Sequence, residues 1–393
     1  MKCFFIPGRK WQLSLSEIKS VAQSLGIRYV ELSHSEKVFL FDVMLDENAL
    51  SLLFSRLGGS IKVGVMIDEP FEYLRAQFVD HERSKELKIP FSASFYSETL
   101  SNREKVSAKM KLGMKLKRWL KDYGYRARFV AKTTEPITSS VLLSTNKVLT
   151  DGFELCLLSH PKNGDTLWGV TLAIQDYAGF AERDYGRPRV NKKKGMLPPK
   201  LARIMVNLAE LPEKSCIWDP FCGSGTVLME TLLLGYSVIG TDIDQTSVDE
   251  TKENLAWLCD TYWISHTQYQ VNLHDIRDGV PVISEFDGIV TEPYLGPILR
   301  SAVSVERMES IVKEIQPLYE AIERITHKKS TVKKKRAVIV VPGFKTDQGW
   351  IDMDPSFESA PHIDDLTQKI SSYPLQWDRP NSIIRRNLKI YAF

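Results

Sequence analysis

The sequence contains one especially informative motif, Asp219-Pro220-Phe221-Cys222-Gly223-Ser224-Gly225-Thr226. It follows a short apolar run, residues 216–218, and precedes a helix-like segment, residues 227–234. A strand, a glycine-bearing turn and a helix in this order form half of a nucleotide-type site, because glycines let a ligand approach and the helix N-terminus offers unpaired N–H groups. No lysine follows Gly225, and an acidic residue, Asp219, ends the strand, unlike in a phosphate loop. The stretch therefore indicates a ligand with a positive centre rather than a triphosphate.

Three further apolar segments end in polar residues. The segment 237–244 carries Asp242 about 20 residues beyond the glycine turn, where an acid typically accepts hydrogen bonds from ribose hydroxyls. The segments 270–275 and 288–294 supply two more candidate strand ends. Open α/β sheets bind ligands at the carboxyl edge of their parallel strands, so we expect these polar residues to line one site.

Together these motifs resemble the S-adenosylmethionine-dependent methyltransferases that methylate exocyclic amino groups of bases. The resemblance implies an α/β fold with a Rossmann-like class I methyltransferase sheet and S-adenosyl-L-methionine as cofactor. It places Asp219 near the methionine ammonium, Asp242 at the ribose, and Asp275 with Ile276 around the adenine. The cofactor-binding residues expected from it are Asp219, Pro220, Cys222, Gly223, Gly225, Thr226, Asp242, Ile243, Asp275 and Ile276. Within the turn, Cys222 is expected to act as a small packing residue.

The segment 291–297, Thr-Glu-Pro-Tyr-Leu-Gly-Pro, stands where these methyltransferases carry Asp-Pro-Pro-Tyr-Gly. In the family a polar side chain accepts hydrogen bonds from the target amine, and an aromatic ring stacks on the displaced base. The resemblance implies that the catalytic residues are Thr291, Glu292, Pro293 and Tyr294. One proline of the family pattern is missing, so Glu292 is the amine acceptor in one alignment and Thr291 in the other. We favour Glu292, whose side chain is longer than aspartate by one methylene.

Two strings narrow the resemblance: Arg183-Asp-Tyr-Gly-Arg-Pro-Arg189 and residues 196–209, which begin Met-Leu-Pro-Pro-Lys. Both are similar to the THUMP-domain tRNA guanine-N2-methyltransferases of the guanine-10 type. This implies methylation of the exocyclic N2 amine of a guanine in tRNA, at position 10. The implied domains are a ferredoxin-like domain (1–80), a THUMP-like RNA-binding domain (81–175), a linker (176–200) and the methyltransferase domain (201–393). The sequence leaves open the modified nucleotide, mono- or dimethylation, the oligomeric state and the need for a small activating partner subunit.

Periodicity and capping signals predict the elements of these domains. In the first domain we expect strands at 2–7, 28–32 and 38–44 and helices at 14–26 and 47–57. In the second we expect a basic helix at 107–123 that packs through Met110, Met114 and Leu120, and strands at 91–96, 126–130, 140–143, 154–159 and 167–172. The methyltransferase domain is expected to end with strands at 336–341, 366–373 and 385–393. The last two resemble the antiparallel hairpin that finishes this fold.

Basic residues gather in two stretches, 109–132 and 183–203, in a chain whose net charge is only +3. Such segments are typical of contacts with a phosphate backbone, although a lysine-rich helix face is more often simply solvated. The predicted RNA-binding residues are Lys115, Arg118, Arg126, Arg187, Arg189, Lys192 and Lys193.

Composition is ordinary for a globular protein: 393 residues, 43% hydrophobic and 26% charged. No apolar run reaches the roughly 18–20 residues that cross a bilayer, and the N-terminal apolar stretch is too short for a secretory signal. The five cysteines form no Cys-x-x-Cys pair, and neither they nor the seven histidines form a metal-ligand cluster. We therefore expect a cytoplasmic protein with reduced thiols, no membrane association and no metal.

Two other functions remain open at this stage. A DNA methyltransferase acting on adenine N6 or cytosine N4 carries a similar motif at 291–297, although the N-terminal units resemble RNA-binding modules. A non-catalytic RNA-binding protein with a degenerate methyltransferase domain would explain the altered motif. The intact glycine turn and Asp242 argue against it, since cofactor contacts would then be free to decay.

Overall fold

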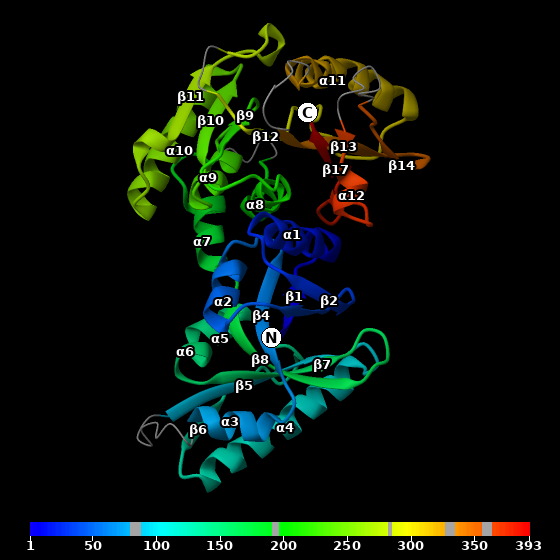
Figure 1. The fold of residues 1–393 in the computed structure, drawn as a ribbon. Coiled ribbons are helices and arrows are strands. Elements are labelled where there is room, and N and C mark those ends of the chain that lie inside the picture. Colours follow the sequence, from blue (N-terminus) through cyan, green and yellow to red (C-terminus); the bar gives the residue numbers. More distant parts are fainter. Residues whose placement is uncertain (79–87, 191–195, 282–284, 327–334, 356–363) are drawn as a thin grey trace. The chain divides into compact units, whose positions relative to one another are not determined.

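The computed structural model describes residues 1–78, 88–190, 196–281, 285–326, 335–355 and 364–393. The chain divides into two compact units (Figure 1). Unit 1 contains residues 1–11, 26–55 and 60–177, and unit 2 contains residues 12–25, 56–59 and 178–393. Two short N-terminal segments therefore pack with the C-terminal part of the chain. Within the described residues, no helix combines the length and the apolar character that a bilayer crossing requires.

Unit 1 is built on one eight-stranded sheet with the order β2-β3-β1-β4-β8-β7-β5-β6. Its strands are β1 (Lys2–Pro7), β2 (Tyr29–His34), β3 (Phe39–Val43), β4 (Ser60–Ile67), β5 (Lys88–Tyr96), β6 (Arg126–Phe129), β7 (Phe153–Ser159) and β8 (Thr166–Ile174). Strand β5 is parallel to β6 and β7, and the other neighbours are antiparallel. The predicted α+β character is confirmed. The boundary at residue 80 stays a prediction, because the antiparallel β4–β8 pairing makes the sheet continuous across it.

The helices of unit 1 are α2 (Glu47–Ser55), α3 (Pro70–Phe78), α4 (Asn102–Asp122), α5 (Ser140–Thr145) and α6 (Val148–Asp151). The sequence did not predict α3 and α6, and two of its expectations for this unit are wrong. The predicted strand at 140–143 is wrong, because Ser139 caps a helix by accepting a hydrogen bond from the Leu142 backbone N–H. The predicted packing of Met114 is also wrong, since its side chain is 62% exposed.

Helix α4 packs through a different stripe, formed by Lys109, Gly113, Leu116 and Leu120. A Cβ on Gly113 would lie 2.3 Å from the ring of Phe129, so glycine is needed for this close approach. The stem of Lys109 is buried while its Nζ donates to the Glu135 carbonyl at 3.0 Å. Burial lowers the pKa of Lys109 to about 8.

A fully buried ion pair lies within the sheet of unit 1. Lys62 Nζ donates to both carboxylate oxygens of Glu154, at 2.8 and 2.9 Å, and to the Thr138 carbonyl. Glu154 also accepts hydrogen bonds from Ser94 and Thr171. Because both charges are paired and hydrogen-bonded, the pair meets the condition under which buried charges are tolerated.

Unit 2 contains a second sheet with the order β11-β10-β9-β12-β13-β17-β15, and β14 and β16 pair with β13 and β17. Its strands are β9 (Cys216–Asp219), β10 (Ser237–Asp242), β11 (Tyr269–Leu273), β12 (Gly288–Thr291), β13 (Arg336–Thr346), β14 (Gly349–Asp352), β15 (Asp364–Asp365), β16 (Gln376–Trp377) and β17 (Ile384–Ala392). The strands from β11 to β13 are parallel, whereas β17 is antiparallel to β13 and β15. The predicted Rossmann-like sheet is confirmed. The predicted strand at 366–373 is wrong: the short strand β15 ends before it, and a helical turn, α12 (Thr367–Ile370), lies within it.

Helices cover both faces of this sheet (Figure 1). Helices α8 (Pro199–Leu208), α9 (Thr226–Leu233) and α10 (Gln245–Tyr262) pack on one face, and α11 (Val305–Thr326) packs on the other. Alternate residues of the strands face the two layers: Val338 lies with α8, whereas Ala337 and Ile339 lie with α11. This three-layer arrangement leaves the carboxyl edge of the parallel strands for a site.

Helix α1 (Trp11–Ser24) contributes a buried carboxylate to unit 2. Glu17 accepts hydrogen bonds from the backbone N–H groups of Gly58 and Gly59, both at 2.8 Å, and from Asn207 Nδ2 at 2.7 Å. Nearby, Ser20 Oγ donates to Glu210 at 2.8 Å. Burial raises the pKa of Glu17 to about 7, although its hydrogen bonds oppose that shift.

Candidate functional site

The parallel register brings three carboxylates to the edge formed by β9, β10 and β12. Asp219 ends β9 and pairs in register with Gly240, so Asp242 lies just beyond it on the neighbouring strand. Glu292 follows the last residue of β12 on the other side of β9. Burial is the main cause of the raised pKa of Asp219, and the nearby charges of Asp242 and Glu292 raise it further. The sequence predicted this convergence, and the sheet order produces it.

The glycine turn is held in shape by backbone contacts with β10. The Cys222 N–H donates to the Thr241 carbonyl, and the Gly223 N–H donates to Oδ2 of Asp242, both at 2.9 Å. Gly223 and Gly225 adopt positive φ angles of 54° and 84°, the left-handed region that favours glycine. The turn therefore presents its backbone at the sheet edge, as the sequence pattern implies.

Asp219 itself is almost fully buried. Its Oδ1 accepts a 2.6 Å hydrogen bond from Thr291 Oγ1 and one of 3.1 Å from the Phe221 N–H. Burial raises the pKa of Asp219 to about 7, since two hydrogen bonds only partly offset the cost of desolvating the carboxylate. A carboxyl of this kind gains stability in its ionised form when a cation binds next to it.

Two residues of α10 that the sequence did not single out also shape the turn. Thr251 Oγ1 donates to the Gly223 carbonyl at 2.6 Å, and Asn254 Nδ2 donates to the Ser224 carbonyl at 2.9 Å. They lie three positions apart on the buried side of α10. This spacing is a weak signal, because it also fits ordinary core packing. Cys222 is buried beside them, and burial raises the pKa of its thiol far above the usual value, as suits a packing role.

Arg187 lies against the same turn. Its Nη1 donates to Thr226 Oγ1 at 2.8 Å, its Nη2 donates to Ser224 Oγ at 3.1 Å, and the side chain is buried. The prediction that Arg187 binds RNA is untested. Its buried side chain groups it with the glycine turn.

The segment that precedes α8 is anchored by a buried ion cluster. It contains α7 (Tyr177–Ala181) and a π-helical turn (Glu182–Gly186). Arg183 and Arg203 both pair with Glu230 of α9, at 2.6 and 2.7 Å, and both guanidinium groups lie over the ring of Phe180. The predicted linker, 176–200, is thus fixed to unit 2 around residue 183.

At the end of β12 the two candidate acceptors differ in position. Thr291 is fully buried and its hydroxyl is engaged with Asp219. Glu292 is partly exposed and forms a bidentate ion pair with Arg386 of β17, in which Nη2 donates to Oε1 at 2.9 Å and Nε donates to Oε2. Tyr294 follows with a side chain that is 50% exposed. Position therefore favours Glu292 over Thr291 as the group that meets a substrate.

The structure gives the residues predicted around the adenine different surroundings near the carboxyl edge of the sheet. Ile276 is buried among residues of the α11 layer, and Asp275 caps a short helical turn and pairs with Arg277. In contrast, Ile243 after β10 and Leu273 at the end of β11 are 61% and 54% exposed. Leu273 was not predicted. Together with Ile243, it provides an exposed apolar surface at this end of the edge.

Apart from Arg187, the predicted RNA contacts fall into three groups. Lys115, Arg118 and Arg126 are exposed on unit 1, and Lys115 also lies over the ring of Phe71. Arg189 is exposed on unit 2 and forms a bidentate pair with Glu253. Lys192 and Lys193 lie outside the described residues.

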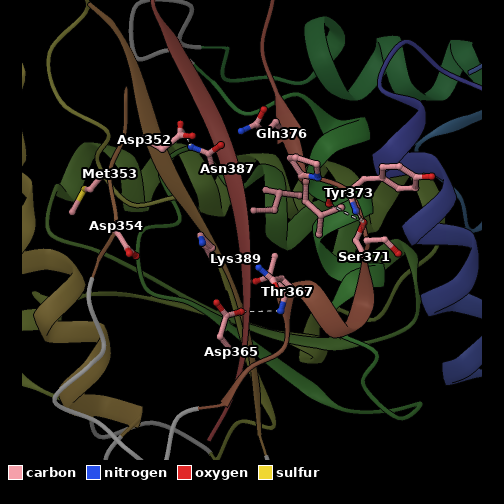
Figure 2. Close-up of a pocket in the computed structure, with 15 residues that line it drawn as sticks. Asp352, Met353, Asp354, Asp365, Thr367, Ser371, Tyr373, Gln376, Asn387 and Lys389 are labelled. Carbon is pink, nitrogen blue, oxygen red and sulfur yellow. Dashed lines mark hydrogen bonds between the residues drawn. The ribbon is translucent and has the colours of Figure 1, made fainter. Parts of the chain in front are cut away.

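A cavity of about 660 Å³ lies elsewhere in unit 2, beside β17. Figure 2 shows Asp352 close to Asn387, and Asp365 close to Thr367, with Lys389 between these two pairs. None of the residues predicted for the cofactor or the acceptor lines this cavity. In the described part of the chain, no three His, Cys, Asp or Glu side chains gather closely enough to hold a metal ion.

A comparison with known families fits this geometry. Residues 186–342 match the family UPF0020, described as RMKL-like, methyltransferase domain. Unit 2 therefore contains a methyltransferase domain, which includes the glycine turn and the end of β12. The arginine that pairs with Glu292 lies beyond the matched segment.

Several relatives of this methyltransferase domain carry the same name. A tRNA (guanine(10)-N2)-dimethyltransferase of Methanothermobacter thermautotrophicus is 39% identical over 120 residues, which are 30% of this chain and 33% of that protein. A protein of the same name from Methanocaldococcus jannaschii is 32% identical over 163 residues, 39% of this chain and 44% of that protein. The chain thus spans less than half the length of these relatives.

Solved structures share the fold over the whole chain. TrmN from Thermus thermophilus gives a TM-score of 0.50 at 14% identity, covering 100% of this chain and 99% of that one. SMU.472, solved in complex with SAH, gives a TM-score of 0.51 at 11% identity, covering 100% and 97%. At such identities the likeness shows the fold alone.

Proposed function

We propose that this chain transfers a methyl group from S-adenosyl-L-methionine to the exocyclic N2 amine of the guanine at position 10 of tRNA. The observation that carries the proposal is the convergence of Asp219, Asp242 and Glu292 at one sheet edge within a matched methyltransferase segment. The name shared by the relatives supports the substrate. The proposed location is the cytoplasm, where tRNA is modified.

The residues present fit the cofactor. Its ammonium would lie beside Asp219, which is buried at the edge, and its ribose beside Asp242. Ile243 and Leu273 offer apolar contacts for the adenine. When bound, the cofactor supplies an electrophilic methyl group on a sulfonium. The protein has to position the amine in line with it and exclude water.

The residues of this chain have to activate the guanine amine, which is a weak nucleophile. The lone pair of the guanine amine is delocalised into the ring, and an acceptor for its N–H bonds favours the positive charge that develops on nitrogen. Glu292 is the proposed acceptor. Tyr294, half exposed beside it, is the proposed stacking ring. Pro293 would hold the chain between the two.

The proposed RNA-binding surface includes exposed cationic side chains of unit 1. Lys115, Arg118 and Arg126 lie on or next to α4 and would contact phosphates and shape rather than base edges. Arg189, Lys192 and Lys193 complete the proposed set. A small activating subunit is compatible with this proposal and would show itself as a rate increase on addition of a cell extract.

The experiment is transfer of labelled methyl groups to unmodified tRNA, followed by nucleoside analysis. We expect N2-methylguanosine with the natural tRNA and none when guanine 10 is replaced by adenine. Dimethylguanosine at longer times would settle the extent of methylation. Label in N6-methyladenine or N4-methylcytosine of duplex DNA, with none in tRNA, would instead identify a DNA enzyme. Cofactor binding without any transfer would favour a non-catalytic RNA-binding protein.

A further inference from the structure

Two consecutive arginines of β17 form equivalent interactions on opposite faces of the sheet. Arg385 makes a bidentate pair with Asp352, at 2.8 and 2.6 Å, and its guanidinium lies 4.9 Å from the ring centre of Trp350. Arg386 makes a bidentate pair with Glu292, and its guanidinium lies 5.2 Å from the ring centre of Trp377. Each has one carboxylate and one tryptophan as neighbours. Of the two paired carboxylates, only Glu292, the partner of Arg386, directly follows a strand that ends at the candidate site.

The Arg386 pair is also the more enclosed. The side chains of Arg386 and Glu292 are 13% and 15% exposed, whereas Asp352 is 40% exposed. Burial disfavours the charged guanidinium of Arg386, but the Glu292 charge outweighs this effect and raises its pKa. A fork-to-fork pair in such surroundings fixes the carboxylate in direction as well as in place.

Glutamate needs this support more than aspartate would. It carries one more methylene and therefore one more free torsion between the backbone and the carboxylate. Arg386 removes that freedom by bonding both oxygens, one through Nε and one through Nη2. Each carboxylate oxygen has two acceptor positions, so each retains one for another N–H donor. The pair thus leaves Glu292 able to accept from an amine while holding it still.

We propose that Arg386 is a positioning residue that holds Glu292 in the orientation needed to accept the amine N–H, and that it compensates for the longer side chain at this position. This inference rests on the proposed function. Arg386 lies outside the matched segment 186–342, so the methyltransferase domain depends on its C-terminal strand for the geometry of the acceptor.

The test compares Arg386→Gln with Arg385→Gln. Both variants lose a bidentate pair and a tryptophan contact from the same strand, so Arg385→Gln measures the general cost to the fold. We expect Arg386→Gln to lower kcat about 100-fold, as a displaced acceptor does, with nearly unchanged KM for tRNA and Kd for S-adenosyl-L-methionine. Arg385→Gln should leave kcat nearly unchanged. Arg386→Lys, which keeps the charge without the fork, should fall between.

Chemical rescue separates positioning from folding. Guanidinium ion at low millimolar concentration should raise kcat of Arg386→Ala by refilling the gap beside Glu292, and should not change that of Arg385→Ala. If Arg386→Gln does not fold, the kcat of Arg386→Lys and the rescue of Arg386→Ala test the inference instead. Equal losses of kcat in the Arg385 and Arg386 variants, in parallel with equal losses of thermal stability, would overturn the inference.

The wild-type reaction distinguishes a failure of the proposed function from a failure of the positioning role of Arg386. If the wild-type chain methylates tRNA and Arg386→Gln does so at the same rate, the positioning role is wrong and the proposed function stands. If the wild-type chain transfers methyl groups to neither tRNA nor DNA, the proposed function fails and the positioning role fails with it. A Glu292→Gln variant with wild-type kcat would show that the amine acceptor lies elsewhere, and Arg386 would then be structural.

Discussion

Thr291 at the end of β12 donates a 2.6 Å hydrogen bond to Asp219 at the end of β9, joining the proposed acceptor strand to the proposed cofactor strand. Both side chains are buried, so no solvent competes for this bond. Thr291 is adjacent to Glu292. The bond therefore links the group expected to meet the cofactor's ammonium to the segment expected to meet the base.

Replacing Thr291 with valine should weaken cofactor binding. The change keeps the shape and removes the side-chain hydroxyl that donates to Asp219, so the ionised carboxylate loses about 1.5–3 kcal/mol of stabilisation. We expect the Kd for S-adenosyl-L-methionine at pH 7 to rise roughly tenfold or more, measured by calorimetry. Thr241→Val is the matched control, because Thr241 is equally buried and accepts from Trp218 Nε1 rather than donating to Asp219. Equal changes of Kd in both variants would contradict the assigned role.

Cofactor affinity should rise with pH. The pKa of Asp219 is raised to about 7, and the ammonium of the cofactor binds the ionised form. Below pH 7 the carboxyl must therefore lose a proton on binding, and affinity should fall by up to about tenfold per pH unit. Calorimetry from pH 5.5 to 7.5, in buffers of different ionisation enthalpy, would detect the released proton. Asp219→Asn should bind weakly at every pH, with no such release.

The free energy of unfolding should fall as pH rises because of Glu17, whereas cofactor affinity should increase. Its pKa is raised to about 7 in the folded state, above the value of about 4.3 in an unfolded chain. Between these two pH values the folded state holds a proton that the unfolded state does not, so the free energy of unfolding falls as pH rises. The contribution of Glu17 is full below about pH 4.3 and is lost by about pH 7, with a slope of up to about 1.4 kcal/mol per unit. Urea unfolding of the wild type and of Glu17→Gln at several pH values would measure this, and an unchanged slope in the variant would rule out Glu17 as its source.

The buried Lys62–Glu154 pair should be costly to break. Lys62→Met leaves Glu154 buried with two hydroxyl donors and without its ion-pair partner, which typically costs about 3–5 kcal/mol. Lys132→Ala removes the exposed pair with Glu135 and should cost about 0–1 kcal/mol. Denaturant unfolding of the two variants gives the contrast. Similar losses in both would mean that the network around Glu154 repacks.

The contiguous parts of the fold and site could be predicted from sequence, because a strand, its turn and the next helix leave a local pattern. The turn at 219–226, Asp242 and Glu292 lie where that pattern places them. The partners that fix them could not be predicted this way. Thr251, Arg187 and Arg386 reach the site from other elements, and contacts between residues far apart in the chain leave no pattern of spacing in the sequence.

The local errors have local causes. Residues 141–143, Val-Leu-Leu, favour a strand by composition, but the cap at Ser139 starts a helix instead. On α4, Met110 and Met114 suggested the packed face, yet a lysine stem and a glycine occupy it. Long lysine stems can be buried with the amine at a polar end, which hydrophobic periodicity does not register.

The bond between Glu17 and Asn207 joins positions 190 residues apart. During synthesis at about 5–20 residues per second, the N-terminal helix leaves the ribosome roughly 10–40 seconds before its partner. Glu17 must remain in water or among temporary contacts for that interval, because Asn207 does not yet exist. Unit 2 can therefore be completed only by recapturing a segment made 190 residues earlier. Folding of this chain cannot proceed strictly from one end to the other.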